Sequence, residues 1–156
     1  MATPEQRLQE LKIVLPPPPQ PVAKYKPTMQ TGRLLYVSGH GPAKYEGQTM
    51  RLGKVGVRLD LEQGKESARL VGINILSTVR NALGSLNRVK RLVKTLGMVN
   101  CTPEFRDHPA VINGCSELFA EVFGNENGIG ARSAVGMGSL PGNIAVEIEA
   151  IFEIAP

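Results

Sequence analysis

The last apolar stretch of the chain carries acidic side chains at alternate positions. Every second residue from Ile144 to Ile154 is apolar, whereas Glu147, Glu149 and Glu153 stand between them. Successive side chains of a strand point to opposite faces of a sheet. The pattern therefore predicts a strand with one buried apolar face and three carboxylates on the other face. A carboxylate in such a position can hold or activate a water molecule.

The stretch before it, residues 132–139, combines Arg132 with three very small residues, Ala134, Gly136 and Gly138. Glycines weaken a strand, so their alternation indicates that another group approaches this strand closely. An arginine can bind a carboxylate through two parallel hydrogen bonds. An arginine beside empty space is therefore a candidate site for a small acid.

We expect these two strands to pair antiparallel through a tight turn. That register places Ala134 opposite Glu149. It places Gly136 opposite Glu147, and it brings Arg132 to the same face, diagonal to Glu149. The arrangement predicts a pocket made of a guanidinium, two carboxylates and a gap. The competing interpretation is a solvated outer face, on which an Arg–Glu pair contributes at most about 1 kcal/mol.

The other residues that could do chemistry form weaker patterns. His40 stands in a glycine-rich segment, where it could donate to an anion or be an ordinary loop residue, and His108 fits the surface start of a helix. Two histidines without clustered ligands predict no metal site. Cys101 and Cys115 are too few for a disulfide scaffold, and Cys115 fits a small buried hydrophobe. Basic residues at 88–94 could contact phosphates or form a solvated sheet edge.

Composition narrows the class of protein. The chain has 156 residues, which suits one domain, and a net charge of +4, which permits anionic partners without requiring them. Aromatic residues make up 4% and Trp is absent, which argues against a stacking surface for single-stranded nucleic acid. No apolar run approaches the roughly 20 residues of a membrane span, and the first residues form no apolar signal segment. We therefore expect a cytoplasmic protein.

The elements that position these residues follow from periodicity. Apolar spacing of three and four predicts two helices, and β-like runs bounded by Gly and Pro predict five strands. The order β-β-α-β-α-β-β predicts an α+β fold in which two helices share one mixed sheet. The predicted strands are 33–37, a weak one at 53–57, 89–99, 132–139 and 144–154; the predicted helices are 68–86 and 107–122.

Residues 1–21 read as an N-terminal extension to a domain at 22–156. Thr3 and Pro4 predict the start of a short helix that ends near Lys12. Residues 16–19 are consecutive prolines, which cannot continue a helix and favour an extended polyproline II strap. The strap either lies across its own domain or displays a ligand to a proline-binding module.

Three motifs resemble those of a known family. Residues 35–42, Leu-Tyr-Val-Ser-Gly-His-Gly-Pro, resemble a strand that ends in Ser-Gly-Gln-x-Pro. Residues 130–135, Gly-Ala-Arg-Ser-Ala-Val, resemble a Pro-x-Arg-Ser signature, and residues 146–151, Val-Glu-Ile-Glu-Ala-Ile, resemble a closing Ile-Glu-Ile-Glu-Ala-Ile strand. Over about residues 22–155 the chain resembles the RidA (YjgF-type) family of enamine/imine deaminases, often labelled L-PSP endoribonucleases. It resembles a longer branch of that family with an N-terminal extension.

The resemblance implies a chorismate-mutase-like fold and a homotrimer with active sites between subunits. It implies hydrolysis of 2-aminoacrylate-type enamines and their imines to 2-oxo acids and ammonia, without a cofactor or metal. Arg132 falls on the arginine that binds the substrate carboxylate, and Glu147 on the glutamate that orients the hydrolytic water. The further pocket positions implied by the resemblance are Tyr25, Ser38, Gly39, Asn113 and Ala134.

Three residues depart from the family pattern. Ala134 stands where many members have Cys, His40 replaces the usual Gln, and Gly130 replaces the usual Pro. These changes leave three hypotheses open. The protein is an imine deaminase, a non-catalytic trimer that binds a metabolite or protects against stress, or an RNA-cleaving or RNA-binding protein.

Overall fold

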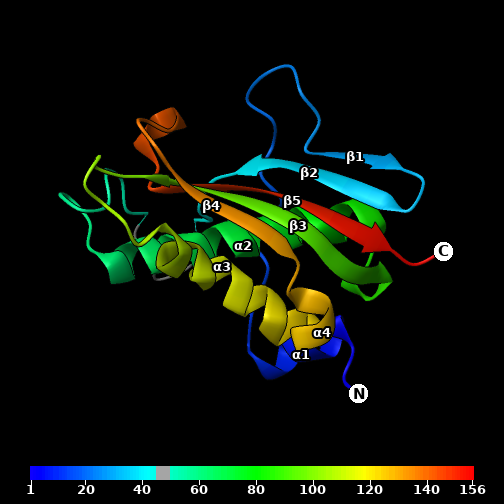
Figure 1. Ribbon diagram of the computed structural model, residues 1–156. Coiled ribbons are helices and arrows are strands. Elements are labelled where there is room, and N and C mark those ends of the chain that lie inside the picture. The colour runs from blue at the N-terminus through cyan, green and yellow to red at the C-terminus, as the bar shows by residue number, and fades with distance from the viewer. Residues whose placement is uncertain (45–49) are drawn as a thin grey trace.

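The computed structural model describes residues 1–44 and 50–156. A five-stranded mixed sheet in the order β1-β2-β5-β3-β4 carries the long helices α2 and α3 on one face (Figure 1). The predicted α+β class, with two helices on one mixed sheet, is confirmed. The strands are β1 Thr28–Thr31, β2 Leu34–His40, β3 Val89–Asn100, β4 Ala131–Met137 and β5 Val146–Ile154; the helices are α1 Pro4–Glu10, α2 Leu61–Leu83, α3 His108–Phe123 and α4 Asn125–Gly128, with 3-10 turns η1 Leu86–Arg88 and η2 Pro141–Asn143.

Helix α2 begins at Leu61, earlier than its apolar stripe predicts, because Asp60 caps it. The Asp60 carboxylate accepts from the Gln63 backbone N–H at 2.8 Å, and the Gln63 side chain accepts from the Asp60 N–H at 3.0 Å. This capping box satisfies two otherwise unpaired donors of the first turn. The helix ends at Gly84, whose φ of 80° is left-handed and favours glycine.

The core lies between the sheet and these two helices. The apolar face of β5 is buried as predicted, and so are the stripes of α2 and α3. Each large apolar side chain buried in this way contributes about 1.5–3 kcal/mol to folding. Burial of these side chains therefore determines which face of each strand packs against the helices. The fully buried residues of this core include Val71, Ile75, Val79, Val111, Leu118, Val146, Ile148 and Phe152.

The predicted pairing of the last two strands is wrong. Strand β3 lies between them: β4 pairs with β3 in parallel, and β5 pairs with β3 antiparallel. Strand β3 has twelve residues, and its last four are all buried, as expected of a strand with neighbours on both edges. The chain after β4 passes through η2 and crosses to the far side of β3 instead of turning back on itself.

The weak strand predicted at 53–57 is also wrong. This segment forms only single bridges, from Val55 to Leu59 and to Cys101. Gly53 and Gly56 have φ values of 113° and 99°, which interrupt an extended strand. On one edge of the sheet, β2 pairs with β1, a strand that was not predicted. The turn between β1 and β2 contains Gly32 in a left-handed conformation.

The N-terminal helix α1 forms as predicted, with a capping box between Thr3 and Gln6. The segment after it approaches α2, where the Ser77 hydroxyl donates to the Pro16 carbonyl. In residues 1–44 and 50–156, no helix has both the length and the apolar character needed to cross a membrane.

Candidate functional site

Arg132 is held between β4 and the first half of α3. Its Nη1 donates to Asn113 Oδ1 at 2.7 Å and to Ser116 Oγ at 3.1 Å, and its Nη2 donates to the Pro109 carbonyl at 3.5 Å. Arg132 and Asn113, two of the residues named by the resemblance, are therefore in direct contact. Ser116 was missed; it lies three residues after Asn113, and that spacing places both on one helix face.

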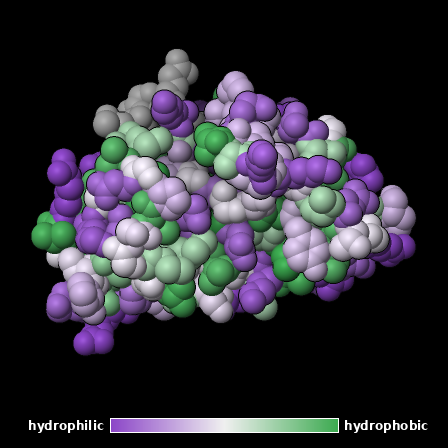
Figure 2. Space-filling model, turned by 90° about the horizontal axis from the view of Figure 1, so that it is seen from above, coloured by the Kyte–Doolittle hydropathy of each residue, from purple (hydrophilic) through white to green (hydrophobic). Residues whose placement is uncertain are grey.

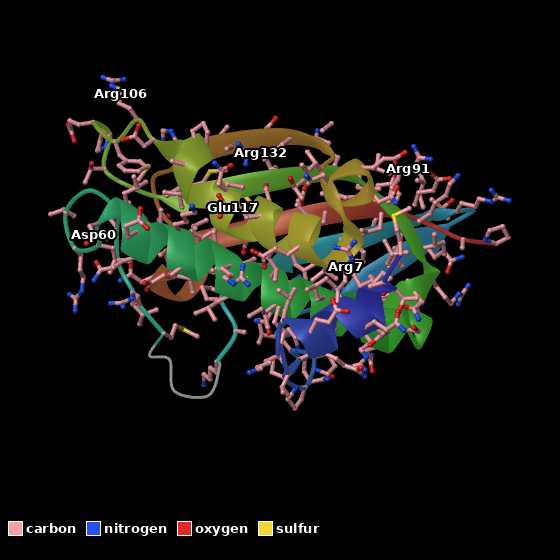
Figure 3. All side chains as sticks on the ribbon, turned by 90° about the horizontal axis from the view of Figure 1, so that it is seen from below. Arg7, Asp60, Arg91, Arg106, Glu117 and Arg132 are labelled. Atoms are coloured by element: carbon pink, nitrogen blue, oxygen red, sulfur yellow. The ribbon has the colours of Figure 1, made fainter. Side chains whose placement is uncertain are left out.

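The Nε–H edge of the Arg132 guanidinium has no acceptor among the residues that the structure describes, whereas both Nη atoms have one. The Nε–H and the neighbouring Nη2–H point the same way and form the fork that binds a carboxylate through two hydrogen bonds. In Figure 3, Arg132 and Glu117 of α3 lie next to each other on the helix side of the sheet, and both line one cavity.

Arg132 does not share a face with the glutamates of β5. Thr95 of β3 pairs with both Arg132 and Ala150, whereas Met98 pairs with Glu147. Ala150 is buried under the helices, so Arg132 is on the helix side and Glu147 on the open side. The predicted pocket of one guanidinium and two carboxylates within a single chain is wrong, because β3 separates the two strands.

The small residues of β4 make room for α3 and not for a carboxylate. A Cβ added at Gly136 would lie 2.6 Å from His108 Nε2 and 2.8 Å from Cys101 Sγ. These two atoms are 3.4 Å apart, and burial raises the pKa of the Cys101 thiol. His108 is therefore not the surface residue that the helix-start pattern predicted. Ala134, next along this face of β4, packs against the core.

Glu147 lies on the open face of the sheet against Gly39. A Cβ added at Gly39 would come within 3.0 Å of Glu147 Oε2, so a larger residue there would displace the carboxylate. Partial burial, and after it the negative charge of Glu149, raise the pKa of Glu147. A carboxylate with a raised pKa is better suited to accept a proton from water near neutral pH than an ordinary exposed one.

The end of β2 beside Glu147 is tied to the preceding segment by a side-chain hydrogen bond. The Ser38 hydroxyl donates to the Lys26 carbonyl at 2.6 Å, and the neighbouring Gly39 packs against the Glu147 side chain. Tyr25 lines a cavity of about 240 Å³ together with Gly39 and the proline segment. Tyr25, Gly39 and Glu147 thus lie at one end of β2 and β5, away from Arg132 and Asn113.

His40 does not fit the anion-donor interpretation. The Ser38 carbonyl can only accept, so His40 Nδ1 carries the proton and donates to it at 2.5 Å, while Nε2 accepts from the Thr78 hydroxyl at 2.8 Å. Both ring nitrogens are occupied in the neutral form. Burial lowers the pKa of His40. His40 therefore fastens the end of β2 to α2.

The basic residues at 88–94 are partly neutralised. Lys90 Nζ and Arg91 Nε pair with the two oxygens of Glu153 at 2.9 Å and 3.0 Å. This carboxylate reduces the positive potential that a nucleic acid would meet. Across the described residues, no group of three or more His, Cys, Asp or Glu side chains could hold a metal ion.

The comparisons with known proteins agree with this fold. A family model described as "YjgF/chorismate_mutase-like, putative endoribonuclease" matches residues 5–148. The protein TCP17 of Trypanosoma cruzi is 40% identical over 147 residues, which cover 94% of this chain and 91% of that protein. A 2-iminobutanoate/2-iminopropanoate deaminase of Dermatophagoides farinae is 28% identical over 142 residues, covering 91% of this chain and 94% of that one.

Among solved structures, the protein Atu1372 of Agrobacterium tumefaciens, a protein of unknown function, has a TM-score of 0.87 and 44% identity. The match covers 97% of this chain and 92% of that one. Because the family model spans nearly the whole sequence, and because relatives of this identity cover it almost completely, the chain belongs to the YjgF/RidA family.

Proposed function

We propose that the protein hydrolyses 2-imino acids and their enamine tautomers to 2-oxo acids and ammonia. The observation that carries this proposal is Arg132, a guanidinium fixed by Asn113 and Ser116 with its Nε edge open. Such an edge fits the carboxylate of a small 2-imino acid. The named activity of the Dermatophagoides farinae relative supports the same class of substrate.

Arg132 and Glu147 lie on opposite faces of the sheet in one chain, so we propose that neighbouring subunits of a homotrimer complete the site. The face of the sheet opposite the helices carries exposed apolar side chains, with Met29 52%, Tyr36 43% and Val135 39% exposed. Figure 2 shows this face, on which hydrophobic and pale surface lies between charged groups. Packing three such faces together would bury the apolar groups together with Glu147. Arg132, on the edge strand β4, would then stand at the border with the next subunit.

In the proposed reaction, Arg132 binds the substrate carboxylate and orients the imine carbon. Glu147 accepts a proton from a water molecule as the water oxygen forms a bond to that carbon. Glu147 returns this proton to the imine nitrogen, which gives a neutral amino alcohol. The hydroxyl proton of the amino alcohol then passes through Glu147 to the nitrogen as the C=O bond forms and the C–N bond breaks, and ammonia leaves with a 2-oxo acid. One water is consumed for each imine. Imine hydrolysis already proceeds in water, so the site has to supply only modest acceleration.

The test uses imines made in place by an amino-acid oxidase, with imine loss followed by a trapping reagent. Arg132→Ala should lower kcat/KM by roughly 30- to 1000-fold, the equivalent of about 2–4 kcal/mol, because a bidentate charged contact is lost. Arg132→Lys should restore only part of it, because a point charge cannot form the fork. Arg106→Ala is the matched control, since Arg106 projects outward far from the site in Figure 3.

Each alternative hypothesis has its own outcome. If the wild type consumes imines no faster than buffer, the proposal of a deaminase fails and a metabolite-binding trimer takes its place. If activity is present but unaffected by Arg132→Ala, the site lies elsewhere. Cleavage of RNA by a nuclease-free preparation, abolished by Arg132→Ala, would instead support the RNA hypothesis.

A further inference from the structure

A cavity of about 490 Å³ lies beside Arg132, between α3, α4 and the start of β4. Arg132 and its partner Asn113 line one end of it. Leu92, Ala120 and Ile129 line the part that lies farther along α3. The cavity thus joins a charged end, at which a carboxylate can bind, to an apolar region.

The cation at the polar end is not neutralised by the protein. The Asn113 and Ser116 oxygens that accept from Arg132 are uncharged. Glu117 also lines the cavity, but its carboxylate pairs with Lys65 at 3.1 Å. The charge of Arg132 therefore favours an anionic ligand at this end of the cavity.

The apolar region is held open by a rigid turn. A Cβ at Gly128 would lie 2.2 Å from the Phe119 carbonyl oxygen, and a Cβ at Gly130 would lie 2.8 Å from the Val93 carbonyl oxygen. The backbone on both sides of Ile129 is therefore packed closely against α3 and β3. This packing holds Ile129 at the edge of the cavity, where 59% of its surface is exposed.

We infer that this cavity receives the side chain of a 2-imino acid larger than 2-iminopropanoate, with an apolar branched or aromatic group, while Arg132 binds the carboxylate. The inference rests on the proposed function and names its substrate class. The cavity volume falls within the range of about 300–1,000 Å³ typical of small-molecule sites, which exceeds what a single methyl group can fill. Burial of an apolar side chain against Leu92, Ala120 and Ile129 would favour the larger substrates.

The experiment compares kcat/KM for imines made from alanine, leucine and phenylalanine. One methylene in a hydrophobic pocket changes kcat/KM by roughly 10- to 200-fold, so the leucine imine should exceed the alanine imine by at least about 10-fold. Ala120→Leu fills the cavity and should remove this preference by lowering kcat/KM for the leucine imine. Ala82→Leu, at an exposed position of α2, is the matched control and should keep it.

Ile129→Asn is a second variant, at an exposed position where folding should be unaffected, and it should also reduce the preference for the leucine imine.

Thermal shift with 4-methyl-2-oxopentanoate and with pyruvate provides a readout that does not need turnover. The larger acid should stabilise the wild type more, and Ala120→Leu should remove the difference. Equal kcat/KM for all imines, or equal shifts by both acids, would overturn the inference while leaving the deaminase proposal intact. Absence of imine turnover would overturn the proposed function, and the thermal shifts would then decide the inference.

Discussion

At the scale of single residues, the site depends on how two charged groups are held. The oxygens that accept hydrogen bonds from Arg132 are neutral, and among the described residues no carboxylate forms a salt bridge with it. Its charge therefore remains available to an anion. Glu147 is the opposite case: partial burial and, after it, the charge of Glu149 make its negative charge unfavourable, so it holds a proton more readily than an exposed glutamate.

The raised pKa of Glu147 predicts how the stability of the folded chain depends on pH. The folded chain binds the Glu147 proton more tightly than the unfolded chain does, so stability falls as pH rises from the usual pKa of 4.5 through the raised pKa of the folded state. Glu147→Gln removes this titration. Its Tm should exceed that of the wild type at pH 7, and the difference should shrink near pH 4. Calorimetry checks both points. Glu126→Gln, at an exposed position, is the control; equal Tm values for Glu147→Gln and wild type at pH 7 would contradict the prediction.

At the scale of elements, the contact between β4 and α3 positions Arg132. Strand β4 lies at the edge of the sheet, and its small residues let the start of α3 pack directly on it. The same helix supplies Asn113 and Ser116, so the distance between the two elements sets the geometry of the guanidinium. A larger residue in this contact would move α3 and its hydrogen-bonding groups together.

Gly136→Val tests this contact. Its side chain would collide with His108 and Cys101, and overpacking of this kind costs about 1–3 kcal/mol. Gly138→Val is the control, because a Cβ at Gly138 meets nothing within 4 Å. Urea unfolding should show a lower midpoint for the first variant and a nearly unchanged one for the second. If both variants lower the midpoint equally, the loss of a glycine and not the α3 contact determines the effect.

At the scale of the whole molecule, the helices cover only one face of the sheet (Figure 1). The other face carries Met29, Tyr36 and Val135 beside glutamates. An exposed apolar surface of this kind is typical of a face that contacts another protein.

Light scattering should therefore give a mass three times the 16.8 kDa of one chain. Val135→Lys places a charge on the open face and should reduce both the mass and the rate of imine consumption. Val57→Lys is the control, because Val57 is 74% exposed in a segment outside the sheet. A monomer mass for the wild type at micromolar concentration would rule out a site shared between subunits.

The sequence by itself determined the features that depend on local periodicity. The alternation in β5 and the stripes of α2 and α3 predicted their buried faces, because each pattern repeats within one element. Thr3 marked the start of α1, because its side-chain oxygen accepts from the Gln6 backbone N–H. The start of α2 at Leu61 was missed because its first turns depend on a cap at Asp60 and not on the apolar stripe.

Only the tertiary structure decided which strands are neighbours. Periodicity shows which residues of one strand share a face, but the order and direction of strands depend on contacts between distant parts of the chain. The insertion of β3 between β4 and β5 placed Arg132 on the helix side and Glu147 on the open side. The family resemblance named Arg132 and Asn113 as pocket residues, but their direct contact came from the packing of α3 on β4. Ser116 and the cavity beside it became visible only when α3 was packed on β4, because no pattern within either element encodes the space between them.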